Sequence, residues 1–261
     1  MIDMNTIVGT HDLALIVLDT LRYDVAAEEM REGRTPNLAR LIPNGWEQRH
    51  SPGTFTYASH CAFFAGFLPT PAQPGKHQRL LALGFEGSET IAPTTCVLEG
   101  ATIVDGLAAR GYHTICIGGV GFFNLKNPLG NALPSLFAER HWSPAIGVTD
   151  PRSFENQVDL VEKSISALAN EQRAFTFVNV SALHQPNHFY LGDGTRDTVR
   201  SHAAALRYID AHLPRLVSAL RPHTFIIICS DHGTLYGEDG YVGHRVAHPI
   251  VTTVPYAEII L

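Results

Sequence analysis

The sequence is poor in cysteine and lacks long apolar runs. Its four cysteines, Cys61, Cys96, Cys116 and Cys229, show no CxxC spacing, which predicts structural thiols in a reducing compartment. No apolar stretch reaches the roughly 18 residues that a membrane-spanning helix needs. The segment after Met1 also lacks the basic region and apolar core of a signal peptide. These absences predict a soluble, cytoplasmic protein without a membrane partner.

Basic residues are also few, and they are not clustered. The chain has 19 Lys and Arg residues against 25 Asp and Glu residues, for a net charge of −6. Such a surface offers no electrostatic footprint for nucleic acid or an anionic membrane. An anionic substrate is still compatible with this charge if bound metal ions supply positive charge. The oligomeric state is left open.

Apolar runs alternate with amphipathic segments along the chain, which predicts an α/β fold. Strands alternating with helices indicate a largely parallel sheet with helices on both faces. The 261 residues, 45% of them hydrophobic, form no second hydrophobic block, so we expect one domain spanning residues 1–261. Buried strands are expected at 13–18, 113–117, 175–180 and 224–228, helices at 35–41, 59–66, 98–110, 154–169 and 201–220, and loops at 69–75 and 119–130.

Acidic residues directly follow two of these strands. Asp19 is the first polar side chain after the first strand, and Asp231 with His232 follows the last. Open α/β sheets bind ligands at the carboxyl ends of their strands, so these residues predict a metal centre at that edge. Asp19 alone is equally consistent with a helix N-cap. Arg22 and Asp24 are better explained as an ion pair or cap.

A hydroxyl-rich segment, residues 53–66, leads into an apolar helix. Thr56 lies at the amino end of that helix, where unpaired N–H groups and the positive end of the dipole stabilise an alkoxide or a phosphate. Thr56 is therefore a candidate nucleophile, with Thr54 and Ser59 as competing hydroxyls. An N-cap at Thr56 with Ser59 three positions on explains the same pattern.

Histidines mark the remaining candidate positions among the 14 in the chain. His184 and His188 follow the strand at 175–180, and Pro186 argues against one helix carrying both. His184 is the better ligand candidate because it lies nearer the strand end. His244 follows a glycine-rich turn that returns the chain toward the site. Arg245 is a candidate hydrogen-bond donor to a substrate phosphate. Five histidines fit ordinary surface or core positions: His50, His113, His202, His212 and His223.

In chain order these motifs resemble the alkaline phosphatase superfamily, in particular its sulfatases, nucleotide phosphodiesterases and phosphoethanolamine transferases. The resemblance extends from about Leu13 to Pro255 and implies a three-layer αβα domain of the alkaline-phosphatase type. It rests on V-L-D-T-L-R-Y-D at 17–24, T-Y-A-S-H-C-A-F-F-A-G-F-L-P at 56–69, G-L-A-A-R-G-Y-H-T at 106–114, His184 with Pro186, and S-D-H-G at 230–233 followed by G-H at 243–244.

The resemblance implies one metal site around the nucleophile. In the family the nucleophile lies ten residues before the glycine that closes its helix, and counting back from Gly66 gives Thr56. Asp19, Thr56, Asp231 and His232 would then hold one metal ion.

The resemblance also assigns the other histidines. His184 and His244 would face a second metal ion or the substrate, with His188 as a further candidate ligand. His60 occupies the place where sulfatases carry an arginine that supports the nucleophile, so it joins Thr56 in the predicted catalytic set.

Threonine at the nucleophile position favours phosphorus chemistry, because sulfatases need a Cys or Ser that is oxidised to formylglycine. We therefore expect a metal-dependent hydrolase of phosphate monoesters or diesters that forms a phosphothreonine intermediate. Imidazole with carboxylate ligands favours Zn²⁺, as one or two ions, with Mn²⁺ next. The alternatives are a soluble phosphotransferase or phosphomutase, a sulfatase-like hydrolase and an inactive metal-binding protein.

Overall fold

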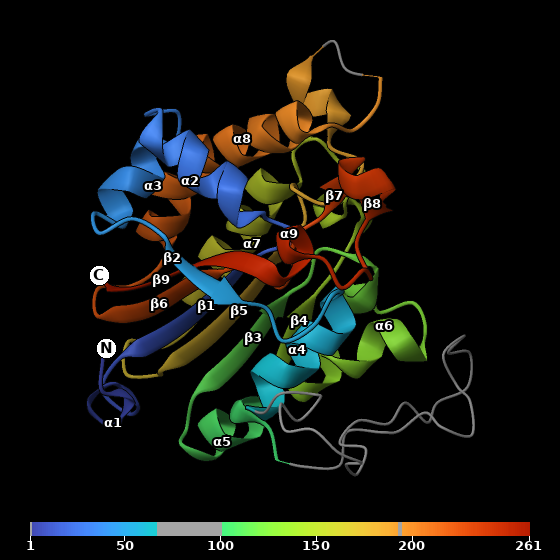
Figure 1. The fold of residues 1–261 in the computed structure, drawn as a ribbon. Coiled ribbons are helices and arrows are strands. Elements are labelled where there is room, and N and C mark those ends of the chain that lie inside the picture. The colour runs from blue at the N-terminus through green and yellow to red at the C-terminus, as the bar shows by residue number, and fades with distance from the viewer. Residues whose placement is uncertain (1, 67–100, 193–194) are drawn as a thin grey trace, which may run out of the picture.

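The computed structural model describes residues 2–66, 101–192 and 195–261. Its centre is a seven-stranded sheet in the order β2-β9-β6-β1-β5-β3-β4, with helices on both faces (Figure 1). This confirms the predicted α/β fold with a largely parallel sheet. The parallel strands are β1 (Asp12–Leu18), β3 (His113–Ile117), β4 (Glu139–His141), β5 (Ala174–Val180) and β6 (Thr224–Cys229).

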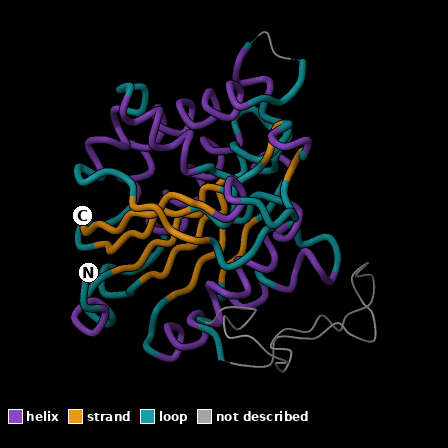
Figure 2. Tube along the Cα trace, viewed as in Figure 1, coloured by secondary structure: helices purple, strands orange, loops and turns teal. Residues whose placement is uncertain are grey.

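Alternate side chains of the central strand β1 point into two separate cores, because successive strand residues face opposite sides of a sheet. Ala14 and Ile16 pack on one side and Leu13 and Val17 on the other. Figure 2 shows the strands enclosed between the two helical layers. The first layer contains α2 (Tyr23–Arg31), α3 (Pro36–Leu41), α7 (Ser153–Ser166) and α8 (Val199–Ala219), and the second contains α4 (Thr56–Ala65) and α5 (Ile103–Ala109).

The other helical segments of the described ranges are short. No helix there combines the length and apolar character that crossing a bilayer requires. These segments are α1 (Met4–Ile7), η1 (Gly121–Phe123), α6 (Pro128–Ala132), η2 (Pro134–Leu136), η3 (Pro144–Ile146), η4 (His188–Leu191), η5 (Glu238–Gly240) and α9 (Pro249–Thr252).

One edge of the sheet is antiparallel, which the sequence analysis did not predict. β9 (Thr253–Ile260) runs antiparallel to β6, and β2 (Glu47–His50) runs antiparallel to β9. All four residues of β2 are exposed, so this strand lacks the apolar alternation that reveals a half-buried strand. A separate two-stranded ribbon consists of β7 (Leu235–Tyr236) and β8 (Val242–Gly243).

Some predicted boundaries differ from the structure. The helix expected at 59–66 begins at Thr56, and the loop expected at 119–130 contains η1 and the start of α6. The helix expected at 98–110 is described from Ile103. Residues 98–100 lie outside the described ranges, as does the loop expected at 69–75.

The long helix α8 continues through Pro214, and α3 compensates for the missing hydrogen bond. Proline has no N–H to donate to the carbonyl of Asp210 one turn earlier, and Asn37 Nδ2 donates to that oxygen at 3.0 Å instead. The Asp210 carboxylate accepts the backbone N–H groups of Asn37 and Leu38 at 3.3 and 2.7 Å. These bonds, all donated by α3 to Asp210, fix α3 against α8.

We predict that Asp210→Ala lowers the free energy of unfolding by about 1–3 kcal/mol, because it leaves the buried N–H of Leu38 and the part-buried N–H of Asn37 without an acceptor. Urea denaturation measures the change. The control is Asp159→Ala on α7, whose side chain is 54% exposed; its effect should stay within about 0.5 kcal/mol. Equal effects of the two substitutions would contradict the proposed capping of α3.

Candidate metal centre

Three predicted ligands meet at the carboxyl ends of two neighbouring strands. Asp19 directly follows β1, and Asp231 and His232 follow β6; the side chains are 0% exposed. Each offers one ligand atom, and these atoms lie within 4.8 Å of one another. In the described ranges this is the one group of three or more His, Cys, Asp or Glu residues with that geometry. The parallel pairing of β1 with β6 therefore brings together residues 212 positions apart.

Thr56 places its hydroxyl against this group. Its Oγ1 lies 3.4 Å from Asp19 Oδ2 and 3.3 Å from His232 Nε2. The N-cap position of α4 is occupied by Phe55, so the alternative of Thr56 as N-cap is wrong. Because α4 begins at Thr56, the N–H groups of its first turn have no partner within the helix. The competing hydroxyl of Ser59 donates to the Asp231 carbonyl at 2.7 Å.

Two buried carboxylate oxygens have no hydrogen-bond partner among the described residues: Asp19 Oδ1 and Asp231 Oδ2. The other oxygens are engaged. Asp19 Oδ2 accepts from Asn179 Nδ2 at 2.9 Å, and Asp231 Oδ1 accepts from the amides of Thr20 and His232 at 3.2 and 3.1 Å. An unpaired buried anion is costly. The two oxygens therefore fit a bound cation.

The pKa values of the two acids reflect the same cost. Burial, reinforced by the nearby Asp231 carboxylate, raises the pKa of Asp19 to about 6. Burial raises the pKa of Asp231 to about 7. Carboxylate, imidazole and hydroxyl donors together suit Zn²⁺, and the share of oxygen donors also suits Mn²⁺.

The imidazoles of His232 and His184 are oriented by backbone carbonyls. His232 Nδ1 lies 2.9 Å from the Gly233 oxygen, and His184 Nδ1 lies 2.6 Å from the Gln185 oxygen. A proton on each Nδ1 leaves Nε2 free to act as a ligand, which is the usual arrangement around metal-binding histidines. Burial lowers the pKa of His232 and favours its neutral form.

His244 completes a cluster of three imidazoles. Its ring centroid lies 4.6 Å from that of His232 and 5.8 Å from that of His184. Burial and these two neighbouring rings lower the pKa of His244 to about 3, so its ring is neutral near pH 7. The structure thus brings His184 and His244 next to the predicted metal ligands.

Arg245, the predicted substrate-binding residue, reaches the start of α4. Its backbone N–H donates to the Thr54 carbonyl at 2.8 Å, and its guanidinium carbon lies 6.0 Å from the centroid of the Phe55 ring. The side chain is exposed. It therefore carries positive charge beside the residues that precede Thr56.

His188, another predicted ligand, lies outside the imidazole cluster. It begins η4, and its Nδ1 lies 3.2 Å from Asp197 Oδ1. Its ring packs edge-on against Phe189, with centroids 5.7 Å apart. We therefore remove His188 from the ligand set. The 3-10 helix η4 begins at His188 and separates it from His184, although the two residues are only four positions apart.

His60 contacts the backbone of Thr56 and makes no hydrogen bond to its hydroxyl. Its Nδ1 lies 2.7 Å from the Thr56 carbonyl oxygen and 3.7 Å from Asp231 Oδ2. Burial lowers its pKa to about 3. The predicted catalytic role of His60 is therefore corrected to a positioning role. The ring is enclosed by four aromatic rings at centroid distances of 5.3–6.0 Å: Phe63, Phe64, Phe123 and Phe177.

The sequence analysis missed two residues that orient the carboxylates. Asn179, on β5, donates to Asp19 and accepts the Val120 N–H at 3.0 Å through its Oδ1. Thr20 has a φ of 65°, and this left-handed conformation aims its N–H at Asp231. An asparagine inside the apolar run of residues 175–180 was the available signal for the first of these.

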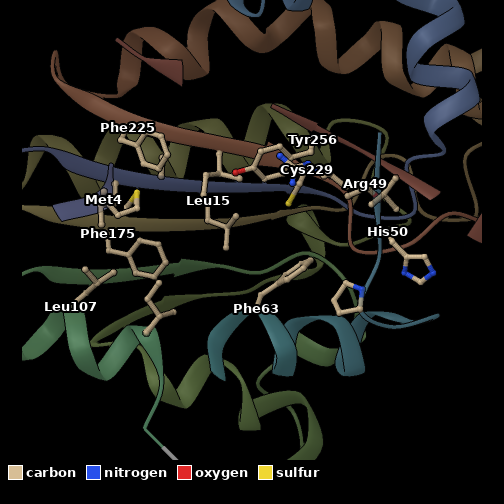
Figure 3. A pocket seen from close by; sticks show the side chains of 17 residues that line it. Met4, Leu15, Arg49, His50, Phe63, Leu107, Phe175, Phe225, Cys229 and Tyr256 are labelled. Carbon is tan, nitrogen blue, oxygen red and sulfur yellow. The ribbon is translucent and has the colours of Figure 1, made fainter. Parts of the chain in front are cut away.

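A cavity of about 270 Å³ lies between the sheet and helices α4 and α5, apart from the acid and imidazole group (Figure 3). Its walls are mostly apolar, with Leu15, Phe175 and Phe225 from the strands, and Arg49 and His50 lie at one end. None of the predicted site residues lines it. The clustered polar chemistry therefore belongs to the metal centre and not to this cavity.

Comparisons with known proteins agree on the family. A family model described as Sulfatase matches residues 11–256. The chain is 25% identical over 134 residues to a phosphopentomutase of Carboxydothermus hydrogenoformans, covering 51% of this chain and 28% of that protein. It is 29% identical over 89 residues to a phosphopentomutase of Helicobacter acinonychis, covering 34% and 20%. The chain thus matches less than a third of the length of these curated relatives.

Solved structures share the fold. The soluble domain of lipooligosaccharide phosphoethanolamine transferase A from Neisseria meningitidis has a TM-score of 0.64 at 16% identity, covering 94% of this chain and 75% of that one. The periplasmic domain of a phosphoethanolamine transferase from Campylobacter jejuni has a TM-score of 0.59 at 15% identity, covering 94% and 78%. A corresponding Escherichia coli domain in complex with Zn has a TM-score of 0.63 at 13% identity, covering 96% and 72%.

We predict that Asp231→Asn stabilises the metal-free protein above pH 7. A carboxyl group whose pKa rises on folding stabilises the folded protein at pH values below its unfolded pKa, near 4. That stabilisation disappears as the pH rises to the folded pKa, about 7. The variant avoids this loss, which is at most a few kcal/mol because one pKa unit corresponds to about 1.4 kcal/mol. Thermal unfolding of chelator-treated protein from pH 4 to pH 8 measures the difference.

Added zinc should raise the melting temperature of the wild type and have little effect on Asp231→Asn. Asp159→Asn, at a half-exposed surface position, is the control and should behave as the wild type. If the melting temperatures of wild type and Asp231→Asn differed by the same amount at every pH, the pKa of Asp231 would not be raised on folding.

Proposed function

This chain belongs to the sulfatase family, within the alkaline phosphatase superfamily, and from that membership we propose that it is a metal-dependent hydrolase of phosphate esters with Thr56 as its nucleophile. Members of the superfamily are enzymes that act on phosphate or sulfate esters. One observation carries the proposal. The Thr56 hydroxyl lies 3.3–3.4 Å from two members of a buried acid and imidazole group whose remaining carboxylate oxygens lack partners.

In the proposed first step, Thr56 Oγ1 forms a bond to phosphorus while the bond from phosphorus to the leaving alcohol oxygen breaks in line. The hydroxyl proton passes to solvent, and the leaving oxygen takes a proton from water. Water then attacks the phosphothreonine, breaks its O–P bond and restores the hydroxyl. A divalent ion bound by Asp19, Asp231 and His232 would lower the pKa of Thr56 and offset negative charge on the phosphoryl oxygens.

The first turn of α4 favours negative charge at Thr56. Thr56 is the first residue of this helix, and the helix dipole places partial positive charge at that end, where N–H groups lack partners within the helix. The His184 and His244 side chains would hold a second ion, and Arg245 would add a charged hydrogen-bond donor to the phosphoryl group.

A second candidate is phosphoryl transfer to an alcohol. The names of the relatives favour it, because they include phosphopentomutases and phosphoethanolamine transferases. The same residues serve both reactions, since only the acceptor of the phosphoryl group differs.

We predict that Thr56→Ala lowers turnover by roughly 10⁴-fold or more, because it removes the attacking oxygen. Initial rates with p-nitrophenyl phosphate and bis-p-nitrophenyl phosphate measure the loss, and elemental analysis should show that the variant still binds zinc. Thr54→Ala removes a nearby hydroxyl that makes no contact with the metal ligands, and it should retain activity. Undiminished turnover by Thr56→Ala would remove the nucleophile assignment.

A third measurement separates hydrolysis from transfer. With p-nitrophenyl phosphate and excess glycerol or ethanolamine, a hydrolase releases p-nitrophenol and inorganic phosphate in equal amounts. A transferase instead yields less phosphate and a new phosphoester, which ³¹P NMR detects. We expect equal release, and turnover of p-nitrophenyl sulfate at less than about one hundredth of the phosphate rate. Faster sulfate turnover would reverse the choice of phosphorus chemistry.

A further inference from the structure

We propose that Tyr236 is a positioning residue that sets the place of His244 relative to His184, and through them controls how the proposed enzyme binds the phosphoryl group. The inference rests on the proposed function. It concerns a polar network next to the metal centre that none of the proposed steps uses.

The Tyr236 hydroxyl joins the β7–β8 ribbon to two other parts of the chain. It lies 3.0 Å from Asn187 Nδ2 and 3.1 Å from His202 Nδ1. Asn187 belongs to the segment that follows His184, and His202 belongs to the first turn of α8. Both partners are 0% exposed. The hydroxyl is therefore held between two side chains that cannot move without opening the core.

The partners of Tyr236 are themselves fixed. Asn187 Nδ2 also donates to the Leu183 carbonyl at 2.9 Å, and its Oδ1 accepts from Ser201 Oγ at 2.5 Å. Leu183 directly precedes His184. The Tyr236 hydroxyl is thus connected, through one asparagine, to the backbone that presents His184.

A second connection ties the ribbon to the segment that follows Asp19. The Tyr236 N–H donates to Glu238 Oε2 at 2.6 Å, and Glu238 Oε1 forms an ion pair with Arg22. The Arg22 side chain is 4% exposed and also pairs with Asp24 at 2.6 Å. One ribbon is therefore anchored to two of the loops that carry site residues.

The ribbon needs these anchors because it is small. β7 and β8 have two residues each, and a hairpin of that size has little stability of its own. His244 directly follows β8. By contrast, Asp19, Asp231 and His232 stand at the ends of central strands and depend less on the ribbon. Loosening Tyr236 should therefore disturb His244 and spare the metal ligands.

The test is Tyr236→Phe, which keeps the ring and removes the hydroxyl. Leaving a buried polar group without its hydrogen-bond partner typically changes an equilibrium constant by roughly 10–100-fold. We expect the KM for p-nitrophenyl phosphate and the Kd of the zinc-loaded protein for inorganic phosphate to rise by about that factor. kcat should change less, and the affinity for the first zinc ion, measured by calorimetry, should be unchanged. Tyr241→Phe, on the same ribbon and 50% exposed, is the matched control.

A structural readout separates positioning from general destabilisation. In ¹H–¹⁵N spectra of the histidine side chains, the signals of His184 and His244 should shift in Tyr236→Phe while those of His113, on β3, stay in place. Glu238→Gln, which keeps the acceptor for the Tyr236 N–H but removes the ion pair with Arg22, should change phosphate binding in the same direction.

Unchanged KM and phosphate affinity in Tyr236→Phe would overturn the inference, as would a parallel loss of zinc affinity. Phosphate binding and the histidine signals need no turnover. A wild-type protein that binds phosphate without hydrolysing esters would therefore refute the proposed function and leave the role of Tyr236 open to the same measurements.

Discussion

The burial of two unpaired carboxylate oxygens is the constraint on which this molecule is built. Asp19 and Asp231 lie at adjacent strand ends, where the sheet excludes water and raises the pKa of both acids. Such an arrangement persists only if the rest of the fold enforces it. The core on both faces of β1, the left-handed backbone at Thr20 and the amide of Asn179 all contribute to that enforcement.

The site combines rigid and adjustable parts. The acids and His232 are fixed by parallel strand pairing, and Thr56 is fixed by the first turn of α4. His244 is carried by a short ribbon whose position depends on side-chain contacts. The residues proposed for the reaction, Asp19, Asp231, His232 and Thr56, therefore all lie in the rigid part. The part that carries His244 can vary without moving Thr56.

The sequence analysis located the rigid part because its signals are local. An apolar run followed by an acid identifies a buried strand and predicts a ligand at its end, as at Asp19 and Asp231. The contacts of His188 and His60 could not be predicted, because a neighbouring 3-10 helix and distant aromatic rings determine them. The exposed strand β2 has no apolar pattern at all. The cytoplasmic location and the metal identity stay predictions.

The antiparallel edge has a consequence for encounters between copies of this chain. An open sheet offers unpaired backbone groups at its rims, onto which a foreign strand can add. Among the residues that the structure describes, one rim is β2, whose four side chains are exposed and include Glu47, Arg49 and His50, and the other is β4, only three residues long. The charged side chains of β2 and the short length of β4 leave little template for strands of other copies to add to the sheet. This protection also holds during folding, before the core is fully packed.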